Sequence, residues 1–172
     1  MSFSLRRCCF LMSVVMGLSI GLPTETIAAD NIVVKYGWLN ESISVEELKT
    51  FSETGETSPK LDFYLQASKQ NPNKVRRMLN KPIPVDGVML SEVLNNRFGG
   101  MILNSFSDII TTPSKRASKE SLRGALVTSA LDNNDISIME VLENYPTSEV
   151  HLQGDRLADT YEQIESILKV LK

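Results

Sequence analysis

The sequence predicts a mainly α fold, a compact multi-helix domain with a small β-hairpin or sheet near its N-terminus. Three observations lead to this prediction. Proline and glycine residues divide the chain into segments of helical length, most segments carry apolar residues at helical spacing, and the clearest alternation lies at 32–45. We expect one domain at residues 30–172, because this length suits a single hydrophobic core.

Residues 1–29 have the features of an export signal. Two arginines precede an apolar run at 8–22, whose 15 residues fall short of the roughly 20 that span a bilayer as a helix. We expect cleavage after Ala28 or Ala29, leaving a periplasmic or extracellular protein without a membrane span. An uncleaved anchor is the alternative.

Removal of this signal changes the composition of the chain. Both cysteines, Cys8 and Cys9, leave with it, which excludes disulfides, thiolate catalysis and thiolate metal sites from the mature chain. The net charge of −3 becomes −4. Nucleic-acid-binding domains usually carry a basic face, so we expect no nucleic-acid partner.

The first predicted elements are a hairpin and a helix. Residues 32–45 are β-branched, aromatic or alternating, with a turn at 37–40. Ser44 and Glu47 have the spacing of a capping box, which predicts that a helix begins there. Gly55 is expected to end that helix in the left-handed conformation.

Prolines mark the next helices. Ser58-Pro59 and Asn71-Pro72 each place a capping side chain before a proline at the first helical position, which predicts helices at 59–69 and 72–80. The stretch 81–87 is expected to be extended, because residues before proline avoid the helical region. Asp86 is expected to cap a helix that continues to about position 94.

A longer helix is predicted at 97–110 from its apolar stripe, and Pro113 ends it. Ser118 is expected to cap the following helix, and residues 132–135 to form a turn. A short helix at 136–144 precedes an alternating segment at 148–153, which we expect to rejoin the N-terminal hairpin.

A final helix is predicted at 155–171. Its apolar residues are spaced by four, three, four and three positions, at Leu157, Tyr161, Ile164, Leu168 and Leu171. We interpret them as a core-facing stripe, since two heptads are too few to require a coiled coil. A docking helix is the alternative.

No catalytic residue is predicted. The segment 17–21 matches the G-x-S-x-G nucleophile elbow, but it lies inside the apolar run of the signal. His151 is the single histidine, so any histidine base must use it. No serine is identifiable as its partner, and we expect a structural or surface histidine.

No metal or cofactor site is predicted either. Residues 132–140 resemble a calcium loop superficially, but they lack its central glycine, and a Gly-rich phosphate loop is absent. Two basic clusters could meet a phosphate, an anionic lipid head group or an acidic partner. They are Lys74, Arg76 and Arg77, and the preferred set Lys115, Arg116, Lys119 and Arg123.

Several segments together resemble a known family. They are "YGWLNESISVEELKTFSETGE" at 36–56, "LDFYL" at 61–65, "VDGVMLSEVL" at 85–94, "SLRGALVTSALD" at 121–132, and the "ENYP" that ends at Pro146. The chain resembles the domain of unknown function found N-terminal to secreted cyanobacterial-type α/β-hydrolases. The 172 residues stop where the hydrolase domain would begin, so we expect the accessory domain standing alone.

The resemblance implies an exported accessory module without transferable catalytic residues. We expect a non-catalytic interaction or regulatory module that binds an α/β-hydrolase, or a lipid or peptide ligand of such an enzyme. Two alternatives stay open: a small ester hydrolase that uses His151, and a structural envelope protein.

Overall fold

The computed structural model describes residues 28–157 and residue 160. Residues 1–27 of the predicted signal, with Cys8, Cys9 and the 17–21 motif, lie outside the described residues, as does most of the predicted final helix. Within the described part, no helix combines the length and the apolar character needed to cross a membrane.

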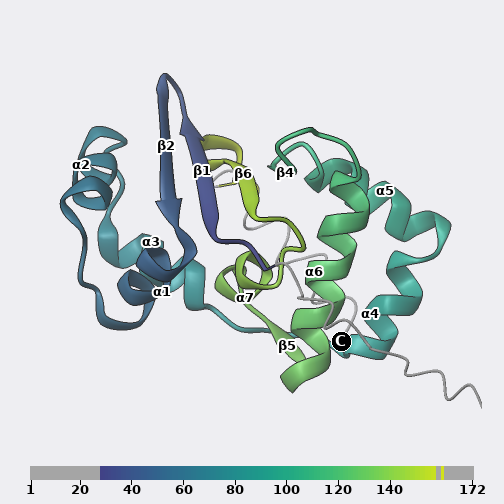
Figure 1. Ribbon diagram of the computed structural model, residues 1–172. Coiled ribbons are helices and arrows are strands. Elements are labelled where there is room, and N and C mark those ends of the chain that lie inside the picture. The colour runs from purple at the N-terminus through teal and green to yellow at the C-terminus, as the bar shows by residue number, and fades with distance from the viewer. Residues whose placement is uncertain (1–27, 158–159, 161–172) are drawn as a thin grey trace, which may run out of the picture.

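A four-stranded mixed sheet forms the centre of the fold (Figure 1). Its strand order is β2 (Leu39–Ser44), β1 (Asn31–Tyr36), β6 (Glu149–Gln153) and β4 (Ile110–Thr111). β1 and β6 are parallel, and the other pairs are antiparallel. The first and last strands of the described chain, β1 and β6, therefore lie side by side.

The two faces of this sheet differ because successive strand residues point to opposite sides. Ile32, Ile43 and Val150 occupy one row across three strands, and all are buried in the core. The opposite face carries polar residues, including His151 of β6 and Thr111, its partner on β4.

Helices α1 to α7 surround the sheet, and residues 154–157 form a further helical stretch in the described part of the chain. The labelled helices are α1 (Val45–Thr54), α2 (Pro59–Ala67), α3 (Pro72–Asn80), α4 (Gly87–Leu94), α5 (Arg97–Phe106), α6 (Ser118–Asn133) and α7 (Ile138–Glu143). In Figure 1, α1–α3 lie on the β2 side of the sheet, and α4–α6 lie beyond β4. An ion pair of 2.7 Å between Lys49 Nζ and Glu143 Oε1 joins α1 to α7.

The prediction of a mainly α fold is wrong, and the fold is mixed α/β. The predicted hairpin is present, and its expected extension by 148–153 is confirmed, but the sheet also includes β4. A second pair, β3 (Ile83–Pro84) with β5 (Asp135–Ile136), was also missed. Strands of two residues have too little alternation to be recognised in a sequence.

Most of the predicted helix starts are confirmed. Ser44, Ser58, Asn71 and Asp86 each accept a backbone N–H as the N-cap of the following helix. Gly55 ends α1 with φ +86°. The Glu47 carboxylate does not close the expected box and instead accepts from the Ser58 hydroxyl.

Two predictions around α5 and α6 are wrong. α5 ends at Phe106 rather than 110, because Ile110 joins β4. Ser118 is the first residue of α6 and not its cap, and the N-cap is Ala117, in the left-handed conformation without a side-chain hydrogen bond. The Ser118 hydroxyl instead accepts from the Thr112 backbone N–H at 3.2 Å.

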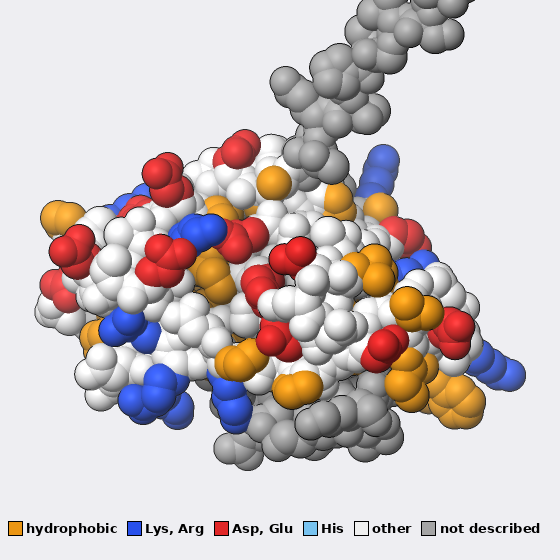
Figure 2. All heavy atoms as spheres, turned by 90° about the horizontal axis from the view of Figure 1, so that it is seen from below, with side chains coloured by type: hydrophobic (Ala, Val, Ile, Leu, Met, Phe, Trp, Pro, Cys, Tyr) orange, Lys and Arg blue, Asp and Glu red, His pale blue; other side chains and the backbone are white. Residues whose placement is uncertain are grey.

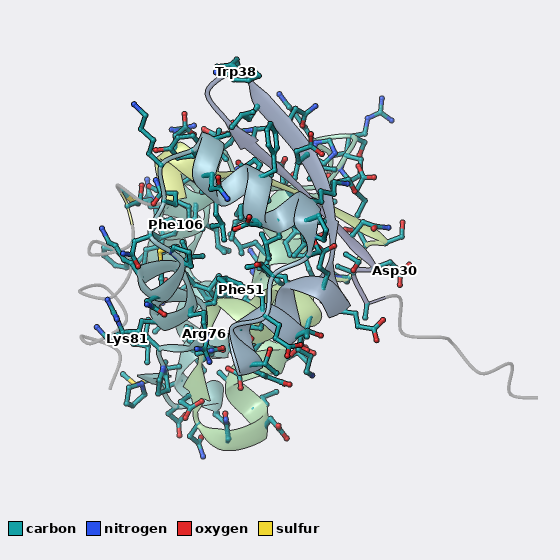
Figure 3. The ribbon with its side chains drawn as sticks, turned by 90° about the vertical axis from the view of Figure 1, so that its left-hand side faces the viewer. Asp30, Trp38, Phe51, Arg76, Lys81 and Phe106 are labelled. Carbon is teal, nitrogen blue, oxygen red and sulfur yellow. The ribbon has the colours of Figure 1, made fainter. Side chains whose placement is uncertain are left out.

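Cross-links between neighbouring helices fix the α1–α3 side. Arg76 of α3 donates to the carbonyls of Ser52 and Glu53 at 3.1 and 2.7 Å. Phe51 of α1 is fully buried in the core, whereas Figure 3 shows Trp38 at the tip of the β1–β2 hairpin.

Candidate functional site

An apolar pocket lies among the helices beyond β4. Three helices, α4 to α6, contribute six of its fourteen lining residues, and the others come from β3, β4, β5, α7, their flanking residues and Leu157. Each of these helices contributes two lining residues that lie four positions apart, on successive turns. They are Leu90 and Leu94 of α4, Ile102 and Phe106 of α5, and Leu122 and Leu126 of α6.

The pocket depends on a close approach between α4 and α5. Gly99 faces the end of α4, and a Cβ there would lie 2.2 Å from the Val93 carbonyl oxygen. Gly87 is also in close contact, with a Cβ position 2.9 Å from the Ala130 backbone of α6. The glycines therefore allow α4 to pack against both neighbouring helices.

Large apolar side chains are also exposed on the same helices. Val88 of α4, Phe98 and Met101 of α5, and Leu131 of α6 are all more than half exposed. Figure 2, which views the molecule from below, shows hydrophobic side chains on the right-hand side, in the region of α4 and α5. Large apolar side chains exposed in one region are typical of ligand or partner contact.

A second pocket has the opposite character. Basic side chains from β1, the β4–α6 loop, α6 and the segment after β6 line it, at Lys35, Lys115, Lys119 and Arg156. The hydroxyl residues Ser107, Thr111 and Ser118 lie between them, and Asp108 and Glu120 add two carboxylates. We call this the basic pocket.

A tight loop shapes one side of the basic pocket. The Thr112 hydroxyl donates to the Arg116 carbonyl at 2.7 Å, and the Lys115 backbone N–H donates to the Thr112 carbonyl at 3.0 Å. Lys115 and Ala117 both have positive φ, at +56° and +55°. The loop therefore turns sharply at the start of α6.

The predicted anion-binding residues are only partly brought together. Lys115 and Lys119 line the basic pocket, whereas Arg116 and Arg123 are not among its described lining residues. The Arg123 Nε is buried without a hydrogen-bond partner in the described part of the chain. Sequence reasoning missed Lys35 and Arg156, which only the β1–β6 pairing brings near the loop.

In the other basic cluster, Arg76 has a structural role. Arg76 binds the carbonyls at the end of α1, while Lys74 and Arg77 are exposed on α3. No group of three or more His, Cys, Asp or Glu residues suited to a metal ion was found in the described ranges.

His151 lies in β6 with a carboxylate as its partner. Its Nε2 is 2.6 Å from Glu149 Oε1, two residues away on the same face of the strand. Thr111 of β4 is paired with His151 in register, and no hydrogen bond joins the two side chains. Among the described residues, no serine hydroxyl bonds to His151.

Two buried tyrosines have altered acidity. Burial raises the pKa of Tyr145 to about 12, and the Tyr145 hydroxyl donates to the Ser118 carbonyl at 3.4 Å. Burial also raises the pKa of Tyr64, whose hydroxyl has no partner in the described part of the chain. Both hydroxyls favour the neutral form, so neither is a base near neutral pH.

Comparison with known proteins places the chain in a family without assigning a reaction. No curated protein and no solved structure matches it. A family model described as "Alpha/beta hydrolase of unknown function (DUF1400)" matches residues 28–153, which include both sheets and the helices α1 to α7. The match does not test whether such a module precedes a hydrolase domain or stands alone. The chain therefore belongs to the family of alpha/beta hydrolases of unknown function, DUF1400.

Proposed function

We propose that this chain is an exported, non-catalytic binding module whose apolar pocket takes the acyl chain of a lipid. The observation that carries the proposal is the lining of that pocket. Aliphatic and aromatic side chains dominate it, and Ser137 is the one polar residue among its described lining residues. Such a lining stabilises a hydrocarbon chain by removing apolar surface from water.

The surface around the pocket supports the same proposal. Phe98 is 73% exposed on α5, the helix that also contributes Ile102 and Phe106 to the lining. An acyl chain entering along α5 would cover part of this surface. Each buried methylene contributes about 0.8 kcal/mol, so a long chain gains enough to bind reversibly.

The environment of His151 supports a non-catalytic role. Hydrolysis of an ester through a histidine base requires a nucleophile within hydrogen-bond reach of the ring. In the described residues the one side-chain partner of His151 is Glu149, and His151 is not among the residues that line the apolar pocket. A bound acyl chain would therefore not be presented to this histidine.

Export after cleavage is part of the proposal. Ala28 is exposed, whereas Ala29 is buried in the core, and the Asp30 backbone N–H donates to the Ser148 carbonyl at 3.0 Å. Cleavage after Ala28 would keep the buried Ala29 in the mature chain. The mass of the protein purified from a secreting cell distinguishes a start at Ala29 from a start at Asp30 or from an intact signal.

The binding test uses two adjacent residues of α5. Ile102 lines the pocket, while Met101 points outward. Titration of the purified protein with a fluorescent long-chain polyene fatty acid should show saturable binding. Ile102→Glu should weaken binding at least about tenfold, because a carboxylate would lie beside the chain. Met101→Glu, with the same change in charge and size class, should have little effect.

The outcomes separate the possible occupants. Absence of saturable binding to the folded protein, or equal loss in both variants, would reject the acyl-chain proposal. Leu157 lines the pocket and is also the first residue of the predicted apolar stripe, which continues to Leu171. If the full chain binds no probe but a variant ending at Leu157 does, the chain's own C-terminal segment is the natural occupant, and the lipid proposal fails.

A second candidate function is ester hydrolysis, favoured by the contact between His151 and Glu149. A carboxylate that orients a histidine is one part of a catalytic triad. Assays with short-chain and long-chain esters test this alternative. Turnover that disappears in His151→Ala but persists in Glu41→Ala, with both proteins folded, would replace binding by catalysis as the function of the chain.

A further inference from the structure

We propose that the basic pocket binds a phosphate group, either on a soluble phosphate ester or on a lipid head group. This site is separate from the apolar pocket and requires no catalytic step. Its four cationic side chains come from three regions that are far apart in the sequence, with Lys35 in β1, Lys115 and Lys119 around the start of α6, and Arg156 after β6.

The strand pairing explains how these segments meet. Lys35 is in register with Gln153 across the parallel β1–β6 pair. The Gln153 backbone N–H donates to the Ile109 carbonyl at 2.8 Å, which holds the end of β6 beside the residues that precede β4. In Figure 1 β6 and β4 lie between β1 and α6.

The cations around this pocket are not neutralised by ion pairs within the described part of the chain. The described ion pairs involve Lys49, Lys60 and His151 instead. Clustering four like charges raises the free energy of the folded protein unless counter-charge is present. The arrangement therefore favours binding of an anion.

The charge of the pocket suits a phosphate monoester. Asp108 and Glu120 offset two of the four cations, so the lining residues carry a net charge of +2. A phosphate monoester carries about −1.5 to −2 near neutral pH. A mono-anionic carboxylate would leave part of the positive charge uncompensated, which makes phosphate the better match.

Hydrogen-bond donors add to this charge complementarity. The lysine and arginine side chains donate charge-assisted hydrogen bonds, and the hydroxyls of Ser107 and Thr111 lie among the lining residues. The start of α6 has no side-chain cap, so its first backbone N–H groups and its dipole supplement the four cations. The cationic side chains remain the main binding groups.

The test compares two double variants of the full chain with identical changes in charge. Lys115→Glu/Lys119→Glu alters the basic pocket, and Lys74→Glu/Arg77→Glu alters exposed cations on α3. The probes are inorganic phosphate, glycerol 3-phosphate, and phosphatidylcholine vesicles with and without phosphatidic acid. Calorimetry measures the soluble probes, and co-sedimentation measures the vesicles.

The wild-type protein should bind at least one phosphate-bearing probe, and the basic-pocket variant should lose about tenfold or more in affinity. The α3 variant should stay within about twofold of the wild type. Binding to glycerol 3-phosphate alone supports a soluble ester as the ligand, and binding only to vesicles with phosphatidic acid supports a lipid head group.

Two results would overturn the phosphate proposal. One is absence of binding to every probe by the folded wild-type protein. The other is an equal loss in both double variants, which would show that net charge and not the pocket attracts the anion. Neither result bears on the apolar pocket, because the fatty-acid titration with Ile102→Glu is a separate measurement.

Discussion

The apolar pocket and the basic pocket share three segments of the chain, yet their chemistry is opposite. Ile109, Ile110 and Leu122 line the apolar pocket, while Thr111 and Lys119 line the basic one. Leu157 lines the apolar pocket, and Arg156, its neighbour in the sequence, lines the basic pocket. One short stretch around β4 and the start of α6 therefore separates a hydrocarbon-lined space from a charged one.

This difference shows how few residues are needed to build two kinds of site. Successive residues of a strand point to opposite faces, so Ile110 and Thr111 face different environments although they are neighbours. On the apolar side, close approaches at Gly99 and Gly87 position α4 against its neighbours. The basic side is shaped by the hydrogen bonds of Thr112. Variants can therefore be chosen that damage one pocket and spare the other.

The largest expected effect comes from Gly99→Ala. The new Cβ would lie 2.2 Å from the Val93 carbonyl oxygen and 2.3 Å from the Leu94 Cα, so α4 and α5 must move apart. We expect the free energy of unfolding to fall by about 3 kcal/mol, together with loss of fatty-acid binding. Chemical denaturation and the fatty-acid titration measure the two effects.

Gly100→Ala is the matched control, because a Cβ at Gly100 meets nothing within 4 Å. Its free energy of unfolding should stay the same or rise by up to about 1 kcal/mol, since alanine favours the helix over glycine. If both variants behave alike, the close approach of α4 and α5 does not form the wall of the apolar pocket.

The next effect is a loss of stability at alkaline pH that comes from the buried tyrosines. The pKa of Tyr145 is raised to about 12, whereas a tyrosine in the unfolded chain ionises near 10. The folded state therefore binds the proton more tightly, and this contribution is complete below pH 10 and is lost as the pH rises toward 12. Tyr64, whose pKa is also raised, acts in the same direction.

Denaturant unfolding of the wild type and Tyr145→Phe across that pH range tests this prediction. The variant should show a shallower loss of stability, because it cannot ionise at position 145. A comparison at neutral pH gives the cost of losing the hydroxyl contact with the Ser118 carbonyl, which is 3.4 Å and therefore weak. Identical slopes above pH 10 would refute the assignment to Tyr145.

The smallest expected effect is that of Ala117→Gly. Ala117 has φ +55°, a conformation that costs a residue with a Cβ about 1 kcal/mol more than glycine. Because glycine also gains entropy in the unfolded chain, we expect a net stabilisation of about 0.5 kcal/mol. Ala67→Gly in α2 should instead destabilise, and a destabilised Ala117→Gly would show that the turn at the basic pocket is not strained.

Local signals in the sequence predicted the local structure of this protein well. Ser58-Pro59, Asn71-Pro72 and Asp86 predicted helix starts because an N-cap side chain bonds the backbone N–H two or three residues further on. Ser137, with its capping box to Glu140, was missed although the same signal is present. The alternation at 148–153 also predicted the return of the chain to the hairpin.

The sequence could not predict what distant segments form together. Ile109 and Ile110 fit the apolar stripe of the preceding helix, and only their pairing with β6 makes β4 a strand. The mainly α prediction failed for this reason. In the basic pocket, Lys115 and Lys119 were recognisable as a local cluster, but Lys35 and Arg156 join them through sheet register.

The most direct measurement of the proposed function is the fatty-acid titration of the purified full chain, its Ile102→Glu variant and its Met101→Glu variant. We predict saturable binding by the wild type, a loss of at least about tenfold in Ile102→Glu, and near-normal binding in Met101→Glu. A folded wild-type protein that binds no fatty acid, or two variants that are equally impaired, would contradict the proposal that the apolar pocket holds an acyl chain.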